Sequence, residues 1–93
     1  MHVLLNGDVI WLKNGVLHRE NDLPAAIRNN GDKEWWVNGR RHRENDLPAI
    51  ETKISKEWWV NGRRHREGGL PTCIQGNTKW WFVNDELHRF LTS

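Results

Sequence analysis

Apolar and polar residues alternate along this chain in short runs, and no stretch shows the 3.6-residue apolar period of an amphipathic helix. Asn-Gly pairs instead separate short segments rich in Trp, Val and long charged side chains, as in WWVNGRRHRE at 35–44 and again at 58–67. Asn and Gly both tolerate the positive φ angles of a type I′ turn, whose twist matches the flanking strands. The pattern therefore predicts β-hairpins.

The turn and its neighbours recur four times. The Asn that opens each turn recurs at steps of 24, 23 and 23 residues, at Asn14, Asn38, Asn61 and Asn84. A Trp stands three residues before each Asn and His-Arg begins four residues after it, while Leu-Pro follows in the first three units. We predict one repeat domain, 1–93, with units at about 1–23, 24–47, 48–70 and 71–93. Its fold should be an all-β, open, elongated array of stacked antiparallel β-hairpins.

Further turns are expected between the units, at 30–32, around 52–53 and at 76–77, with 6–8 as the same turn in the first unit. The Pro of each Leu-Pro pair should lie on a loop or at a strand start, where its missing N–H does no harm. The acids after His-Arg, at 20–22 and 44–46, should form turns and balance the Arg charge.

A two-residue turn fixes which residues face each other across a hairpin. Around the turn at 38–39 the expected pairs are Val37 with Arg40, Trp36 with Arg41, Trp35 with His42, and Glu34 with Arg43. Neighbouring pairs point to opposite sides, so the Trp35 pair shares a side with Val37 and Arg40. The Trp36 pair shares the other side with the expected ion pair of Glu34 and Arg43, and Glu57 and Arg66 repeat that ion pair.

One Trp–His pair recurs in every unit, which predicts a structural ladder of packed aromatics with each imidazole hydrogen-bonded to a neighbouring loop. The pairs are Trp11 with His18, Trp35 with His42, Trp58 with His65, and Trp81 with His88. Equivalent His residues lie at least two strands apart, ~10 Å, which is too far to share an ion. We therefore expect no metal site and no cofactor.

The opposite side carries Trp and Arg in the two central units, and it is the candidate binding surface. Its residues are Trp36, Arg41, Arg43, Trp59, Arg64 and Arg66. Trp planes beside guanidinium groups suit a protein hot spot or the stacking of a base beside a phosphate contact. The alternative is a set of cation–π contacts on a solvated face. The end units hold apolar residues at these places, which fits caps or a dimer surface.

These repeats resemble MORN repeats, whose unit is close to NG-D-x-Y-x-G-x-W-x-NG-x-x-H-G. Residues 6–8, Trp11, residues 14–15 and His18 fit this pattern, as do the matching positions of later units. The resemblance covers almost the whole chain, although Arg follows His where the family has Gly, and Leu-Pro-Ala replaces a Gly-Thr-Tyr-like strand. This variant is similar to repeats of phage, bacterial and giant-virus proteins. The resemblance implies an elongated single-sheet array that binds or assembles rather than catalyses.

Composition narrows the function further. The net charge is only +2, so the chain is not a polybasic tail, and its seven Trp must supply much of the burial. No Ser or Cys stands in a nucleophile setting and no carboxylate pair is singled out, so we expect no enzyme. The first apolar run has no basic residues before it and is interrupted at 6–8. We therefore expect no signal peptide, no membrane partner and a cytoplasmic location, in the host cell if the protein is viral.

Three hypotheses follow. The first is a binding module for a partner protein, with the resemblance suggesting a phage-type inhibitor of a host defence complex. The second is capture of a nucleotide or single-stranded nucleic acid by the same Trp and Arg side. The third is a structural, self-assembling protein that forms a homodimer through its apolar end units.

Overall fold

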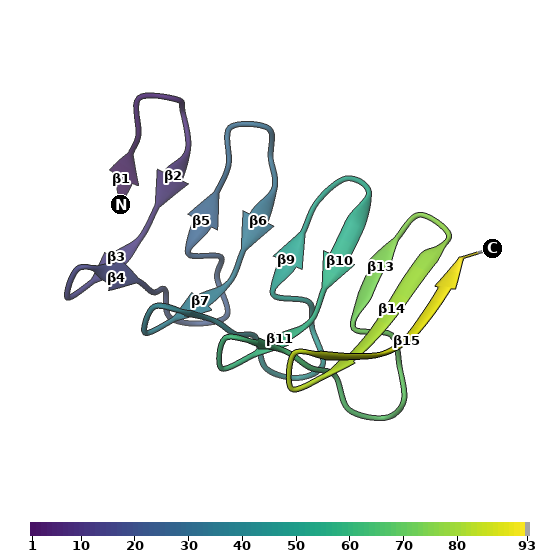
Figure 1. Cartoon of the computed structure of the whole chain (residues 1–93). Coiled ribbons are helices and arrows are strands. Elements are labelled where there is room, and N and C mark those ends of the chain that lie inside the picture. Colours follow the sequence, from purple (N-terminus) through teal and green to yellow (C-terminus); the bar gives the residue numbers. More distant parts are fainter. Residues whose placement is uncertain (93) are drawn as a thin grey trace.

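The computed structural model describes residues 1–92, and the described chain is all-β, as the sequence predicts. Ser93, the last residue of the predicted domain, lies outside the described residues. The molecule is elongated, with extents of 39 × 24 × 19 Å. Figure 1 shows hairpins that follow one another from the N-terminus to the C-terminus in a sheet that does not close. The predicted open array of antiparallel β-hairpins is confirmed.

The larger sheet contains nine antiparallel strands in chain order. They are β1 (His2–Val3), β2 (Val9–Ile10), β5 (Ala26–Ile27), β6 (Lys33–Glu34), β9 (Ile50–Glu51), β10 (Ser55–Glu57), β13 (Cys73–Gln75), β14 (Thr78–Val83) and β15 (Glu86–Thr92). Strands β1 and β15 form its two edges. Turns at 4–8, 28–32 and 52–55 close three of its hairpins with backbone hydrogen bonds, which confirms the turns expected there.

Three short hairpins lie in a row below this sheet in Figure 1. They are β3 (Leu12–Lys13) with β4 (Val16–Leu17), β7 (Trp36–Val37) with β8 (Arg40–Arg41), and β11 (Trp59–Val60) with β12 (Arg63–Arg64). Their Asn-Gly turns take the expected positive φ values, such as 51° at Asn38 and 78° at Gly39. Trp36 pairs with Arg41 and Val37 with Arg40, so the predicted register is confirmed.

The chain bends at the ladder Trp of each of the first three units, and the sequence did not indicate this corner. Trp35 is the only residue between β6 and β7. Its N–H donates to the carbonyl of Ala49 in the next unit (2.7 Å), while its own carbonyl accepts the N–H of His42 (3.2 Å). Trp35 therefore links the nine-stranded sheet to the short hairpin, so the hairpins of the array are divided between one large sheet and three two-stranded sheets instead of the single sheet that the resemblance implies.

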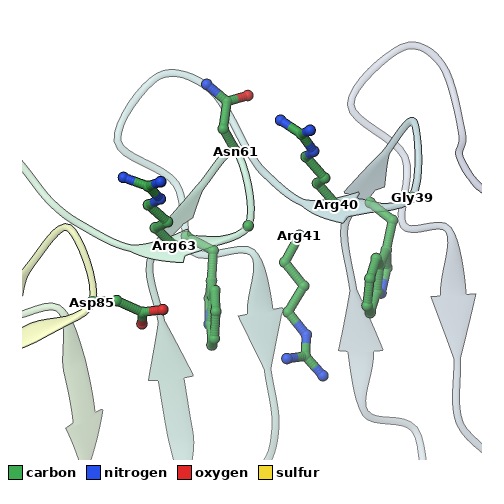
Figure 2. A pocket seen from close by; sticks show the side chains of 9 residues that line it. Gly39, Arg40, Arg41, Asn61, Arg63 and Asp85 are labelled. Carbon is green, nitrogen blue, oxygen red and sulfur yellow. The ribbon is translucent and has the colours of Figure 1, made fainter.

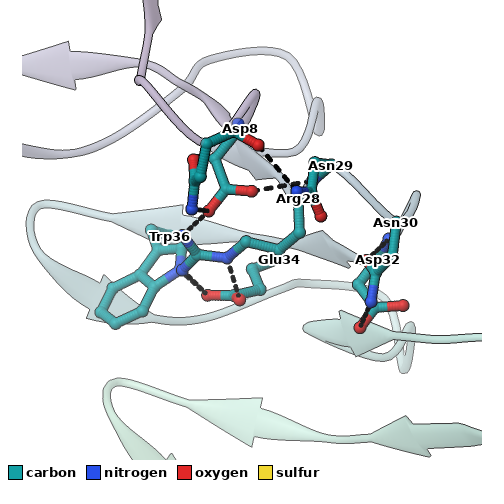
Figure 3. A network of polar contacts seen from close by, with 8 residues as sticks. Asp8, Arg28, Asn29, Asn30, Asp32, Glu34 and Trp36 are labelled. Carbon is teal, nitrogen blue, oxygen red and sulfur yellow. Dashed lines mark hydrogen bonds and ion pairs between the residues drawn. The ribbon is translucent and has the colours of Figure 1, made fainter.

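This corner overturns two predicted ion pairs. Glu34 stays in the nine-stranded sheet, between Ala26 and Ile50, so it cannot face Arg43 across the hairpin. Glu34 instead accepts hydrogen bonds from Arg28, at 2.8 and 3.1 Å, and Figure 3 shows Arg28 reaching Asp8 as well. The equivalent pair of Glu57 and Arg66 fails for the same reason.

Small side chains fill the angle where the two layers meet. Ala25, Ala26 and Ala49 are fully buried, and Thr72 takes the place of Ala49 one unit later with 1% of its surface exposed. The Thr72 hydroxyl accepts the N–H of Phe82 (2.9 Å) and donates to its carbonyl (3.0 Å). The residue after Pro is therefore a core position, because a larger side chain would separate the layers.

The Arg that follows His stacks on the ladder Trp. The guanidinium carbon of Arg43 lies 3.7 Å from the ring centroid of Trp35. Its Nε donates to Asp22 of the preceding unit (2.9 Å) and its Nη1 donates to the carbonyl of Pro48 (3.1 Å). Only 12% of the Arg43 side chain is exposed. Arg43 is therefore part of the repeat framework and stacks on Trp35, not on the Trp36 side of the hairpin where alternation placed it, while its role in binding stays a prediction.

The same arrangement recurs along the array. Arg66 lies 3.7 Å from the Trp58 ring and donates to Asp46 and to the carbonyl of Pro71. Arg19 stacks on Trp11 at 3.6 Å and Arg89 on Trp81 at 4.7 Å. Arg66 therefore also stacks on its ladder Trp and does not lie beside Trp59 as predicted. The cause is again the corner, since the alternation of sides does not continue past the Trp–His pair.

Each of the first three ladder His residues binds the turn of the next hairpin, as predicted. The Nδ1 atom of His18 accepts the N–H of Asn38 (2.9 Å) and that of His42 accepts the N–H of Asn61 (3.0 Å). The bond from Asn84 to His65 is longer, at 3.4 Å. Because Nδ1 is the acceptor, Nε2 carries the proton and donates to the Glu two residues later, at 2.8 Å in His18.

The Glu-Asn-Asp-Leu segments are tight turns that cover the next ladder Trp. Asn21 and Asp22 both have positive φ, 63° and 56°, and Gly68-Gly69 replaces the corresponding pair in the third unit. The indole N–H of Trp35 donates to the carbonyl of Asp22 (3.0 Å). Trp58 and Trp81 repeat this bond to the carbonyls of Asp46 and Gly69, both at 3.0 Å. The expected turns and charge balance at 20–22 and 44–46 are therefore confirmed.

The last unit ends differently. Phe90 stands where the earlier units have Glu, and β15 continues beside β14 instead of forming the Glu-Asn-Asp-Leu turn. Trp80 and Phe90 are paired across these strands, with ring centroids 5.5 Å apart. A bulge replaces the corner of the earlier units. Trp81 pairs with Arg89 and Phe82 with Leu87, so the predicted pair of Trp81 with His88 does not form. In the part of the chain that is described, no helix has the length and apolar character needed to cross a membrane.

Replacing Arg43 by Ala should lower the free energy of unfolding by about 2 kcal/mol, because the change removes the stack on Trp35 and charge-assisted hydrogen bonds. Arg40→Ala, an exposed change three residues earlier, should cost less than about 0.5 kcal/mol. Urea denaturation monitored by Trp fluorescence measures both. Similar losses in the two variants would contradict a framework role for Arg43.

Acid should destabilise the fold through carboxylates whose pKa is lowered. The backbone N–H of Asn29 lowers the pKa of Asp8, and the Arg66 guanidinium lowers that of Asp46, both from 3.8. Because their pKa values are lower when folded than when unfolded, their contribution is complete above pH 3.8 and is lost as the pH falls through the folded values. A pH series of Tm should fall in this range, and Asp46→Asn should make the fall less steep. An equally steep fall in Asp46→Asn would contradict the assignment.

Candidate functional site

An alternating row of aromatic and guanidinium groups runs across the short hairpins. We call it the Trp/Arg stack, and it consists of Trp36, Arg41, Trp59, Arg64 and Phe82. The guanidinium carbon of Arg41 lies 4.9 Å from the Trp36 ring and 5.0 Å from the Trp59 ring. Arg64 lies 5.7 Å from Trp59 and 4.1 Å from Phe82. Four of the six predicted binding residues are therefore brought together.

The stack forms because neighbouring hairpins are held side by side. The N–H of Gly62 donates to the carbonyl of Arg41 (2.8 Å), and the N–H of Arg43 donates to that of Trp59 (3.3 Å). Strands lie about 4.8 Å apart, so side chains on the same face of neighbouring strands are within stacking distance of each other. The indole N–H of Trp36 also donates to Glu34 (2.9 Å), which fixes the plane of the ring.

The stack is half-buried and faces the nine-stranded sheet. Arg64 and Phe82 line a hollow of about 170 Å³ together with Glu57, Cys73 and Trp80 of that sheet. Burial raises the pKa of the Cys73 thiol to about 11, so the thiol stays protonated at neutral pH. The ladder Trp residues lie deeper, since Trp35 is 6% and Trp58 7% exposed. Trp36 and Trp59 are half-buried, and both line the groove described next.

A groove of about 560 Å³ opens between the turns of neighbouring hairpins. The lining includes four stack or turn residues and two further Arg side chains: Trp36, Arg41, Trp59, Gly62, Arg40 and Arg63. Figure 2 shows Arg40 and Arg63 extending from the hairpins in the direction opposite to Arg41. Sequence reasoning missed Arg40 and Arg63 because it placed them with the ladder. Their position directly after each two-residue turn was the available signal, since hairpin tips are exposed.

The charges of this groove are unevenly compensated. Arg64 Nε donates to Asp85 at 2.7 Å, and this bond lowers the pKa of Asp85. Among the described residues, Arg41 takes part in no ion pair within 4.0 Å, and its buried Nε has no hydrogen-bond partner. The nearby Glu34 carboxylate already accepts bonds from Arg28 and Trp36. Leaving a buried polar atom without a partner costs about 1–3 kcal/mol of stability. Arg41 is therefore suited to donate a hydrogen bond to an incoming anion.

Two other hollows, of about 360 and 430 Å³, lie on the ladder side. Arg43 lines both, and Arg66 lines the larger one. These hollows are equivalent by the repeat, and each lies between a Glu-Asn-Asp-Leu or Glu-Gly-Gly-Leu turn and a hairpin. Their Arg groups are already bonded to Asp22 and Asp46. Within residues 1–92, no group of three or more His, Cys, Asp or Glu side chains is placed to hold a metal ion.

No family model matches this chain. Searches of curated proteins and of solved structures give no match either. The resemblance to MORN repeats therefore stays a prediction from the quoted motifs, and the function must be argued from the groove and its charges.

Proposed function

We propose that this chain is a non-enzymatic binding module that holds a partner protein in the groove along the Trp/Arg stack. The observation that carries the proposal is Arg41, a half-buried cation between two indoles with no ion-pair partner among the described residues. The exposed Arg40 and Arg63 add positive charge at the rim of the same groove. Trp and Arg are the residue types that most often dominate protein interfaces, so an acidic protein surface is the partner that this chemistry fits.

A protein partner is favoured over a nucleotide or single-stranded nucleic acid. A base would need an open indole face, but Arg41 and Arg64 both stack on the Trp59 ring. A base could stack there only by displacing a guanidinium. A protein segment needs no such displacement, because it can reach the guanidinium groups with carboxylates and contact the indole edges with apolar side chains.

The resemblance to repeats of phage and other viral proteins extends this proposal to a biological role. A small cytoplasmic binding module of this kind would act as an inhibitor of a host defence complex by covering an acidic functional surface. This extension rests on the quoted repeat motifs, and the proposed binding to the groove does not depend on it.

Self-association is a second candidate function, because both edge strands of the nine-stranded sheet are exposed. Val3 is 65% exposed at one edge, and Leu87 and Phe90 are 55% and 53% exposed at the other. Edge strands with apolar side chains can pair with a second copy. Sedimentation across protein concentrations tests this candidate, and a monomer at every concentration would exclude it.

The groove is tested by reversing its exposed charges. Arg40→Glu with Arg63→Glu should weaken binding of a captured partner at least tenfold, because both guanidinium groups lie at the groove without a role in the framework. The matched control is Lys56→Glu with Lys79→Glu, which changes the net charge equally at exposed positions of β10 and β14. Isothermal titration with the partner captured from nuclease-treated host lysate measures both variants.

Equal affinities of the groove variant and the native chain would place the partner elsewhere. Loss of capture on nuclease treatment, with a steep dependence of affinity on salt, would favour the nucleic-acid alternative instead.

A further inference from the structure

Two successive turns of the array share one backbone arrangement but differ in one side chain. The N–H of Asp85 donates to the carbonyl of Arg64 (3.0 Å), as the N–H of Gly62 does to that of Arg41 (2.8 Å). The Asp85 carboxylate then accepts Arg64 Nε at 2.7 Å and the backbone N–H of Arg64 at 3.3 Å. The chain therefore carries its own example of a carboxylate bound beside the second Arg of a hairpin.

The Arg41 position has the same surroundings without that carboxylate. Arg41 lies between Trp36 and Trp59, as Arg64 lies between Trp59 and Phe82. Gly62 supplies no side chain, and the Arg41 Nε that corresponds to the donor in Arg64 has no partner among the described residues.

The turn leaves room for a side-chain carbon at the position of Gly62. A carbon placed on Gly62 in the Cβ position would lie 3.6 Å or more from its nearest neighbours, the side-chain carbons of Arg40, which is ordinary contact. The Arg40 side chain is exposed and can move aside. The groove reaches the same residues from solvent.

We infer that Arg41 binds an Asp or Glu carboxylate of the partner protein, at the place that the Asp85 carboxylate occupies beside Arg64. This inference rests on the proposed binding function and names the chemistry that the groove recognises. In the Asp85 copy a single carboxylate oxygen meets both Nε and the backbone N–H, so a lone side-chain carboxylate is sufficient. The neighbouring Arg40 and Arg63 favour an acidic segment over an isolated acid.

The direct test follows the Nε–Hε resonance of Arg41 in the ¹⁵N-labelled full chain. Titration with the peptide acetyl-Gly-Asp-Gly-amide should shift this resonance to saturation and leave that of Arg64 unchanged. The Asn version of the peptide should shift neither resonance. A larger saturable response to inorganic phosphate than to the Asp peptide would overturn the assignment to a carboxylate.

Two reciprocal variants locate the site. Gly62→Asp should form an internal ion pair with Arg41 and remove the response of Arg41 to the peptide. It should also weaken the binding of the captured partner at least tenfold. The turn can hold Asp, since Asp85 takes a φ of 72° where Gly62 has 82°. Asp85→Gly should remove the internal carboxylate, so that Arg64 begins to respond to the peptide.

Gly15→Asp is the matched control, because it places the same residue at the same turn position, with a φ of 80°, nothing within 4 Å of the added carbon and a location outside the groove. It should leave both the Arg41 response and partner affinity within twofold of the native chain. An unchanged response of Arg41 in Gly62→Asp would overturn the inference. If that occurs while Arg40→Glu with Arg63→Glu still loses the partner, the carboxylate site fails and the binding groove stands.

Discussion

The stack of an Arg on each ladder Trp is the interaction on which the rest of this structure depends. Arg43 contacts the Trp35 ring, the Asp22 carboxylate of the preceding unit and the carbonyl of Pro48. It thereby ties together three chain segments from successive units. Because the fully buried side chains are small, these ties and the Trp rings replace the large apolar core of a globular domain.

The same residue type has a different role two residues earlier in the chain. The ladder Arg43 uses its Nε and both Nη atoms in hydrogen bonds, whereas Arg41 in the Trp/Arg stack keeps an Nε without a partner among the described residues. Arg64 shows that this difference depends on the turn of the next hairpin, since Asp85 forms an ion pair with Arg64 whereas Gly62 has no side chain to pair with Arg41. Arg41 therefore lacks an ion-pair partner among the described residues where the next turn keeps the Gly of the repeat, and Arg64 has one where the last turn replaces that Gly by Asp85.

Much of this arrangement could be predicted from local chemistry. The pairing of Trp36 with Arg41 follows from a two-residue turn, and so does the reach of His42 to a neighbouring loop. The error at Arg43 arose from extending strand alternation through Trp35, where the chain turns a corner. Neither the hydrophobic pattern nor the turn residues encode this corner, because it is stabilised by a hydrogen bond from Trp35 to Ala49 in the next unit.

The sequence by itself determined that this protein is a β-hairpin repeat, because Asn-Gly turns and a near-constant step are local properties of the chain. It also determined the register of each short hairpin, since turn length alone decides which residues face each other. Only the tertiary structure decided which Arg residues belong to the framework and which are exposed in the groove. That choice depends on contacts between units more than 20 residues apart, such as Asp22 with Arg43 and Arg64 with Asp85, and no local pattern contains them.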